Sequence, residues 1–378
     1  MLKTLREFGC DNEGGKVTVP RIAVTSGDPA GIGPEIMARA ASGLRKRVAD
    51  EELSLLLIGA RSAHLEALMQ LGLDDPATPV SVAKPGAELP PIGFIDIDAA
   101  RAHVPSGQST AEGGRIAYDA IAAAVRLALD RAVDAICTGP ISKEALNFAG
   151  HHYSGHTELL ADLTGARDSV MLLVHGHMRV SHITTHTALE DVPKRVTPER
   201  ISRVVSLTDQ ALKALNVPRR RIAIAALNPH AGEGGLFGRQ DIDVVEPTIR
   251  RLREQGYDVY GPVPGDTVFV KLRAEQFDAV VAMYHDQGHI PVKLLGFSVD
   301  SKTGRWEALS GVNVTLGLPI IRTSVDHGTA FDIAGRGIAS ETSLIEAIDL
   351  AVTLARALRL DRAVRLTWPS ADKASPGA

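Results

Sequence analysis

Three histidines stand just beyond three segments that are typical of buried strands. His186 ends the segment VSHITTH, His230 ends IAIAALNPH, and His285 follows AVVAMY. In a parallel α/β sheet the active site lies beyond the carboxyl ends of the strands, so three imidazoles placed there can converge on one divalent cation. Each histidine taken singly fits an ordinary loop residue equally well. Their repeated position favours a catalytic metal site with open coordination positions.

A second polar group opens a predicted helix. His156 and Thr157 follow Gly155 and begin the segment HTELLADL. The first backbone N–H groups of a helix are free to bind an anion such as phosphate. Thr157 could instead serve only as the helix cap.

Three further polar residues interrupt apolar segments near the C-terminus. Lys293, Asn313 and Arg322 are each surrounded by residues that are typical of strands. Burying such groups costs free energy unless each is paired or binds a ligand. The guanidinium of Arg322 suits the paired oxygens of a phosphate or carboxylate, although an internal salt bridge would also satisfy it.

Two glycine-rich segments frame the chain. The first, at 26–36, reads SGDPAGIGPEI and predicts a turn before a helix, with Pro34 in the first turn. Ile36 stands where a dinucleotide fingerprint needs its third glycine, which favours a plain structural turn. In the second segment, Gly328 and Gly335 mark a loop that can approach a ligand closely.

Composition narrows the classes of protein. The chain has 378 residues with 13 histidines and only two cysteines, which excludes a disulfide framework and a cysteine-based zinc site. The 41 basic and 45 acidic residues lack the broad positive field of a nucleic-acid binder. No apolar stretch is long enough to span a membrane, and residues 1–19 lack the apolar run of a secretory signal. We therefore expect a cytoplasmic protein with neither nucleic-acid nor membrane partners.

Short apolar runs alternate with amphipathic helical patterns. Helices are expected at 112–133, 197–216 and 343–359, with Thr197 capping the second. Strands are expected at six apolar runs: 21–25, 53–59, 135–139, 169–174, 221–227 and 279–284. This alternation predicts an α/β protein with a largely parallel sheet.

Seven motifs in order resemble one family. GDPAGIGPE, TGP, GHTE, LNPHAGEGG, MYHDQG, GVNVTLGLP and IRTSVDHGTAFDIAG, spread over residues 22–358, closely resemble the 4-hydroxythreonine-4-phosphate dehydrogenases of the PdxA family. Two of them are also similar to isocitrate and isopropylmalate dehydrogenase patterns. The resemblance implies two α/β/α lobes with a cleft between them, and a homodimer with the active site near the interface. The predicted division is an N-terminal tail (1–19), a first lobe (20–137 plus about 315–367), a second lobe (138–314) with most of the metal and substrate residues, and a C-terminal tail (368–378).

The resemblance also assigns roles to individual residues. It implies that His186, His230 and His285 bind the metal, with Zn²⁺, Co²⁺, Mn²⁺ and Mg²⁺ all open. It implies a substrate site at His156, Thr157, Lys293, Asn313 and Arg322. Asp266 and Asp286 match acidic positions near the metal and are candidates for proton transfer. The loop that resembles an adenosine-binding loop implies NAD, or NADP, at His327, Gly328, Asp332 and Gly335.

The implied reaction is oxidative decarboxylation of a small anionic substrate, a four-carbon 4-phosphorylated 3-hydroxy acid, with NAD and a divalent metal. The segment LLGFSVDSKTGRWEALSGV is longer than in the biosynthetic enzymes and resembles the paralogues that act on D-threonate or D-erythronate 4-phosphate. Substrate identity therefore stays open between these and 4-hydroxythreonine 4-phosphate. A terephthalate cis-dihydrodiol dehydrogenase is the alternative, and a non-catalytic module that binds a metal or ligand is a more remote one.

Overall fold

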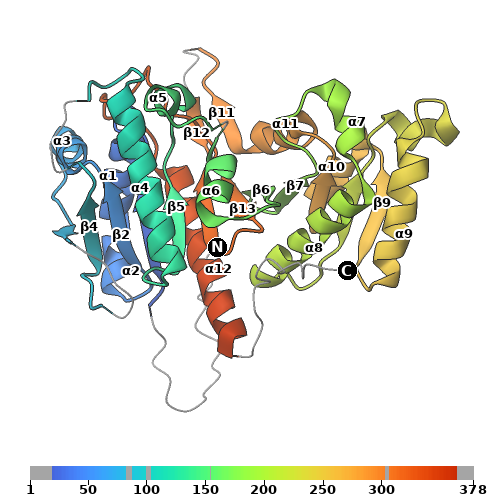
Figure 1. Cartoon of the computed structure of the whole chain (residues 1–378), viewed down its shortest axis with the longest axis horizontal. Coiled ribbons are helices and arrows are strands. Elements are labelled where there is room, and N and C mark those ends of the chain that lie inside the picture. The colour runs from blue at the N-terminus through green and yellow to red at the C-terminus, as the bar shows by residue number, and fades with distance from the viewer. Residues whose placement is uncertain (1–18, 82–86, 99–103, 154, 303–305, 364–378) are drawn as a thin grey trace, which may run out of the picture.

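The computed structural model describes residues 19–81, 87–98, 104–153, 155–302 and 306–363. The predicted C-terminal tail lies outside these residues, and so does the predicted N-terminal tail except for Val19. Within the described residues the chain is an α/β protein built on a large sheet with helices on both faces (Figure 1). The predicted fold class is therefore confirmed, while the predicted boundaries of the two lobes stay a prediction.

One mixed sheet of twelve strands crosses the described part of the chain in the order β3-β4-β2-β1-β5-β14-β13-β6-β7-β10-β8-β9. All six predicted strands are present, and the sequence patterns missed several edge and central ones. The strands are β1 (Arg21–Thr25), β2 (Ser54–Gly59), β3 (Thr78–Pro79), β4 (Ile92–Asp96), β5 (Ala135–Thr138), β6 (Val170–His175), β7 (Met178–His182), β8 (Ile222–Ala225), β9 (Val259–Val263), β10 (Ala279–Ala282), β13 (Val312–Leu316) and β14 (Ile321–Val325), with β11 (Phe297–Val299) and β12 (Trp306–Leu309) forming a separate pair.

The sheet contains two parallel blocks that run in opposite directions. The first block extends from β3 to β14, and the second from β7 to β9. Between them the pairings β14 with β13, β13 with β6, and β6 with β7 are all antiparallel. An odd number of reversals makes the blocks antiparallel to each other. The expectation of a largely parallel sheet is thus right for each block and wrong for the centre.

Helices cover both faces of the first block. Successive residues of a strand point to opposite sides of the sheet, and in this block the residues on both sides are apolar and buried. Ile22 and Val24 of β1 face the core beside α1 and α12, whereas Ala23 faces the core beneath α4. The helices are α1 (Gly33–Gly43), α2 (Arg45–Ala49), α3 (Arg61–Leu71), α4 (Ala111–Leu129), α5 (Lys143–Phe148), α6 (His156–Thr164), α7 (Val192–Arg195), α8 (Pro198–Ala214), α9 (Glu246–Glu254), α10 (Gly265–Arg273), α11 (His285–Gly296) and α12 (Thr342–Ala363). Short 3-10 turns lie at Leu189–Asp191 and Pro229–Gly235, and a π-helical turn lies at Asp241–Val245.

The local signals for α8 are confirmed. The Thr197 hydroxyl accepts a hydrogen bond of 3.2 Å from the backbone N–H of Arg200, and Pro198 occupies the first helical position. This cap satisfies one of the free donors that every helix start leaves. None of the described helices is long and apolar enough to cross a membrane.

The described residues of the segment 294–312 include the antiparallel pair of strands β11 and β12. Its base is closed by the backbone N–H of Ser310, which donates to Gly296 O at 2.9 Å. The Ser310 hydroxyl also bonds to His175 of β6 and Glu346 of α12, at 2.9 and 2.8 Å. Two parts of the main body therefore hold the base of this hairpin.

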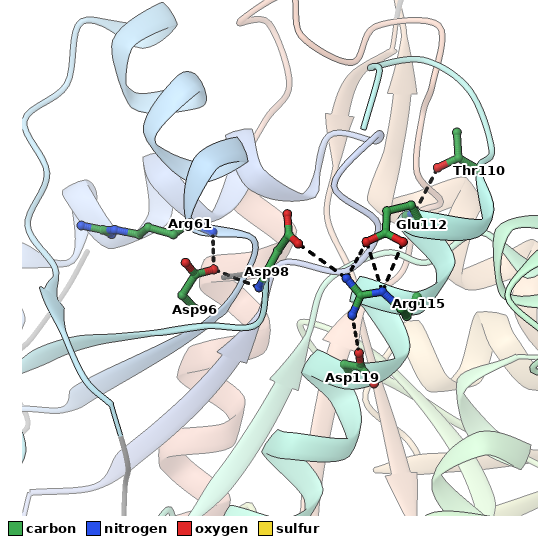
Figure 2. Close-up of polar contacts among 8 residues, drawn as sticks. Arg61, Asp96, Asp98, Thr110, Glu112, Arg115 and Asp119 are labelled. Atoms are coloured by element: carbon green, nitrogen blue, oxygen red, sulfur yellow. Dashed lines mark hydrogen bonds and ion pairs between the residues drawn. The ribbon is translucent and has the colours of Figure 1, made fainter. Parts of the chain in front are cut away.

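One arginine joins the start of α4 to the loop after β4. Arg115 donates to Glu112 at 3.1 Å and to Asp119 at 2.7 Å, and lies 3.5 Å from the buried carboxylate of Asp98 (Figure 2). The Asp98 backbone N–H donates to Asp96, which fixes the turn beyond β4. A single partly exposed cation thus balances three carboxylates from two elements.

We expect Arg115→Ala to lower the free energy of unfolding by about 1–3 kcal/mol, because it removes a cation from the buried carboxylate of Asp98. Chemical denaturation of both proteins measures the difference. Arg239→Ala is the matched control, since both partners of its ion pair with Asp243 are exposed and solvent screens their attraction, so its loss should leave stability nearly unchanged. Equal effects of the two substitutions would contradict the special role of Arg115.

Candidate functional site

The three predicted metal-binding histidines follow three neighbouring strands of the second block. His186 follows β7, His285 follows β10 and His230 follows β8, and these strands lie side by side in parallel. All three therefore come after carboxyl ends at the same edge of the sheet. The three histidines thus follow strand ends as the sequence indicates, and their role as metal ligands stays a prediction.

His186 and His285 lie close together. Their ring centroids are 6.0 Å apart. Nδ1 of His285 lies 2.7 Å from Asp286 Oδ1, and Nδ1 of His186 lies 3.5 Å from Glu158 Oε1. Because a carboxylate lies beside each Nδ1, the Nε2 atoms are the nitrogens available to bind a metal. A carboxylate on the other ring nitrogen is the usual support for a metal-binding histidine.

His230 lies in a left-handed segment of backbone. His230, Ala231 and Glu233 have φ angles of 51°, 54° and 42°, between glycines that are also at positive φ. Such angles in residues other than glycine cost free energy and are most common at functional sites. The described residues include no group of three or more His, Cys, Asp or Glu arranged to hold a metal ion. A single chain therefore does not assemble the predicted three-histidine site from its described residues.

A cavity of about 440 Å³ opens beside His186. Arg195 at the end of α7 lines it, and the guanidinium of Arg195 makes no hydrogen bond or ion pair with any described residue. The walls are otherwise polar, with threonine hydroxyls and two acidic groups that suit a polyhydroxylated ligand. The lining residues are Glu158, Asp168, Ile183, Thr184, Thr185, His186, Thr187, Arg195 and Arg200.

Arg322 is a fully buried cation in the sheet. Its side chain is 1% exposed, and its guanidinium donates to the hydroxyls of Thr138 on β5 and Thr315 on β13, at 2.8–3.2 Å. No carboxylate among the described residues pairs with it, and burial lowers the pKa of Arg322 to about 10. A buried positive charge with only neutral acceptors favours an anion nearby.

Two further predicted substrate residues present unsatisfied polar atoms. Burial, and next the charge of Arg322, hold the pKa of His156 well below its usual range, so the imidazole is neutral. No described group lies within hydrogen-bonding distance of the buried Nε2 of His156 or of Oδ1 of Asn313. His156 and Thr157 form the first turn of α6, as predicted. These atoms are free to bind a ligand.

Lys293 departs from its expected setting. It lies on α11 rather than on a strand, with 40% of its side chain exposed, and its Nζ is 3.9 Å from Asp326 Oδ2. Burial raises the pKa of the Asp326 carboxyl, and the charge of Lys293 opposes that rise. The helix thus carries Lys293 from the second block to the carboxyl end of β14 in the first.

The two predicted acidic residues differ in their surroundings. Asp286 is 71% exposed and bonds to the ring of His285, an arrangement that suits orienting the imidazole. Asp266 is exposed in the first turn of α10. Their assignment to proton transfer stays a prediction.

The glycine-rich segment at 26–36 packs against the predicted cofactor loop, which begins at His327. The backbone N–H of Ile32 donates to Thr329 O at 2.9 Å, and a side chain at Gly31 would come within 2.8 Å of the same oxygen. Glu35 accepts from Ala339 N–H at 2.7 Å, and Arg39 donates to Gly337 O at 2.7 Å. These contacts give the motif the structural role that its sequence favoured.

The loop itself leaves groups available to a ligand. Burial lowers the pKa of His327, and no described group lies within hydrogen-bonding distance of its buried Nε2. Gly328, Asp332 and Gly335 are exposed along the same loop. The arrangement is compatible with a cofactor and leaves its binding a prediction.

Sequence reasoning missed His289 and Glu158. His289 stacks on His285 at 3.6 Å between ring centroids, and Glu158 lies against His186. The spacing of four residues between His285 and His289 on one helix was a signal that could have drawn attention to the pair. Glu158 carried no such signal beyond its place after Thr157.

Comparison with known proteins identifies relatives of this chain. The model of the family "Pyridoxal phosphate biosynthetic protein PdxA" matches residues 51–351. The chain belongs to the PdxA family. A Bradyrhizobium diazoefficiens protein, named provisionally as a D-threonate 4-phosphate dehydrogenase, is 61% identical over 339 residues, covering 90% of this chain and 98% of its own.

Two other relatives carry names for related activities. The D-threonate 4-phosphate dehydrogenase of Salmonella typhimurium is 44% identical, over 88% of this chain and 98% of its own. The crystal structure of a 4-hydroxythreonine-4-phosphate dehydrogenase from Klebsiella pneumoniae superimposes with a TM-score of 0.73, at 41% identity, over 89% of this chain and 99% of that one. The similarity extends over nearly all of these proteins, so it includes the site.

We expect Thr138→Val to destabilise the protein by about 1.5–3 kcal/mol, because two donors of the buried Arg322 lose their acceptor. Thr138→Ser keeps the hydroxyl and should recover most of the loss. Urea denaturation of the two variants gives the comparison. Equal destabilisation of the serine and valine variants would show that methyl packing, not the bond to Arg322, is responsible.

Proposed function

We propose that the protein is a metal-dependent dehydrogenase that uses NAD to oxidise and decarboxylate a four-carbon 4-phosphorylated 3-hydroxy acid. The observation that carries the proposal is the buried Arg322, whose charge has only neutral hydroxyl partners among the described residues. Placed beside neutral His156, it forms the kind of site that a phosphate would complete. The names of the relatives point to the same substrate class.

Among the substrates that the sequence left open, we favour D-threonate 4-phosphate. The Bradyrhizobium and Salmonella relatives are both named for it. The β11–β12 hairpin also fits the paralogous branch, and its base is held by contacts to His175 and Glu346. The hairpin follows directly on α11, which carries Lys293 toward β14, so its position bears on the substrate site.

In the proposed mechanism, the substrate phosphate binds Arg322, Asn313 and the start of α6 at His156 and Thr157, with Lys293 as a second cation. This remote binding energy orients the reacting carbon. The nitrogens of His186, His285 and His230 would hold a divalent cation, which when bound lowers the pKa of a coordinated hydroxyl and stabilises the negative charge left by loss of CO₂. Zinc, cobalt and manganese suit such a nitrogen-rich set, and magnesium suits it less.

NAD, when bound along the loop from His327 to Gly335, would accept the hydride, since the side chains supply no redox group. The threonine hydroxyls of the cavity beside His186 would contact the substrate hydroxyls. Asp286 would keep Nδ1 of His285 hydrogen-bonded and thereby hold the ring in one orientation.

We further propose that the site is completed in a homodimer, with His230 supplied by a second copy. His186 and His285 lie together within one chain, whereas its described residues form no three-ligand group. His230 lies on a left-handed segment that continues into the exposed side chains of Leu236 and Phe237. Exposed apolar residues beside an unpaired ligand suit a contact between two copies.

The first experiment is a screen for NAD reduction with D-threonate, D-erythronate and 4-hydroxythreonine 4-phosphates and the terephthalate cis-dihydrodiol, each with Zn²⁺, Co²⁺, Mn²⁺ or Mg²⁺. We expect the highest kcat/KM with D-threonate 4-phosphate. Arg322→Lys should raise KM for phosphorylated substrates by about 10- to 100-fold, because a planar two-pronged donor becomes a point charge. Arg47→Lys is the control, because Arg47 forms a partly exposed ion pair with Asp349 and is not among the candidate site residues. No NADH formation under any condition would favour the non-catalytic alternative.

The second experiment mixes inactive chains. When His186→Ala and His230→Ala chains are mixed and allowed to exchange subunits, each mixed dimer should contain one intact site. We expect about a quarter of the wild-type activity to return, because half of the dimers are mixed and each has one complete site of two.

A mixture of His186→Ala and His285→Ala chains is the matched control for subunit exchange. Those two residues lie in the same chain's part of the site, so every site in a mixed dimer keeps one lesion and no activity should return. Recovery in neither mixture would place all three histidines in one chain.

A further inference from the structure

Behind His285 lies a row of stacked imidazoles. The ring of His289 faces that of His285 with centroids 3.6 Å apart and an interplanar angle of 11°. His289 also meets His182 of β7 in a tilted contact, with ring centroids 4.8 Å apart and an interplanar angle of 46°. His182 is fully buried and His289 is 7% exposed, so the row leads from the core to the candidate metal site.

His289 is held in one orientation. Its Nδ1–H donates to the backbone carbonyl of His285 at 2.9 Å, one helical turn earlier. Burial, and next the neighbouring His285, lower the pKa of His289 to about 4, and burial lowers that of His182 to about 3. The three rings contact one another in series, since His182 meets His289 and His289 stacks on His285.

The helix approaches the sheet as closely as glycine allows. A side-chain carbon at Gly288 would lie 2.3 Å from Nε2 of His182 and 2.9 Å from Cγ1 of Val180. This close approach of α11 to β7 brings His289 into contact with both His182 and His285. Packing against these two rings and the hydrogen bond from its Nδ1 fix the position of His289.

We propose that His289 is a positioning residue that supports one face of the His285 ring, while Asp286 holds the Nδ1 edge, so that Nε2 of His285 has a single direction in which to bind a metal. The inference rests on the proposed function, in which His285 is a metal ligand. Two supports at right angles, one on the face and one on the edge, remove both the tilt and the rotation of the imidazole. A flat ring at position 289 is the feature that provides the first of them.

The proposal predicts that ring shape at position 289 controls metal affinity. With Co²⁺ as the probe, His289→Phe should keep the dissociation constant of the purified protein within about threefold of wild type, because it retains a flat face. His289→Leu and His289→Met should weaken Co²⁺ binding about 10- to 100-fold, as loss of support around a metal ligand usually does. The visible absorption of bound Co²⁺ reports a changed ligand geometry independently of turnover.

Matched controls separate this role from general packing. His64→Leu removes another fully buried histidine, which packs on Phe94 in the first block, and should leave Co²⁺ affinity unchanged. His285→Ala should abolish tight Co²⁺ binding. The far-ultraviolet circular dichroism of each variant establishes that it is folded at the temperature of the titration, and His289→Met offers a flexible side chain should leucine fail to pack.

The outcomes are distinct. Phenylalanine near wild type with leucine and methionine both weakened would support the positioning role. The positioning role would be overturned if the His289→Leu and His289→Met variants kept the wild-type Co²⁺ affinity and spectrum. It would also be overturned if His289→Phe bound Co²⁺ as weakly as those two variants. Either result would leave His285 a ligand. Unchanged Co²⁺ binding in His285→Ala would instead refute the proposed metal site.

Discussion

The burial of one uncompensated cation constrains the centre of this protein. Arg322 lies inside the sheet with only threonine hydroxyls as described partners, and those hydroxyls come from the strands on either side of β14. A charge removed from water is costly unless its donors are satisfied, so β5, β14 and β13 must keep their register for Arg322 to be tolerated at all. The same charge, which has no described carboxylate partner, is the reason why we propose an anionic ligand here. Under that proposal, stability and recognition depend on the same group.

The opposed directions of the two parallel blocks would keep their carboxyl ends apart if no element joined them. Helix α11 provides the connection. It begins at His285, beyond the end of β10, and brings Lys293 to Asp326, beyond the end of β14. The metal-binding candidates of the second block and the anion-binding candidates of the first are thereby linked by one rigid element. Gly288, with no room for a side chain, shows how closely that element is packed.

Much of this arrangement could be predicted from local patterns. Six largely apolar runs became strands, Thr197 and Pro198 began a helix, and the three histidines followed strand ends. The antiparallel centre could not be predicted, because β7 and β13 carry polar residues among their apolar ones and the apolar pattern of a strand such as β6 says nothing of its direction. Lys293 was assigned to a strand-like setting because a short apolar run resembles both states. Among the described residues no third ligand lies near His186, and this depends on tertiary contacts between segments far apart in sequence, which local patterns do not report.

The end of the chain completes its beginning. β14 is the neighbour of β5 in the sheet, and α12 packs on β1, β5, β13 and β14. During synthesis the first block therefore keeps an open edge at β5, and the part of its face that α12 covers stays exposed, until residues 321–363 have been made. Contacts so distant in sequence also close slowly. A chain that ends before residue 321 would therefore leave the edge of β5 and the apolar residues under α12 exposed to neighbouring molecules.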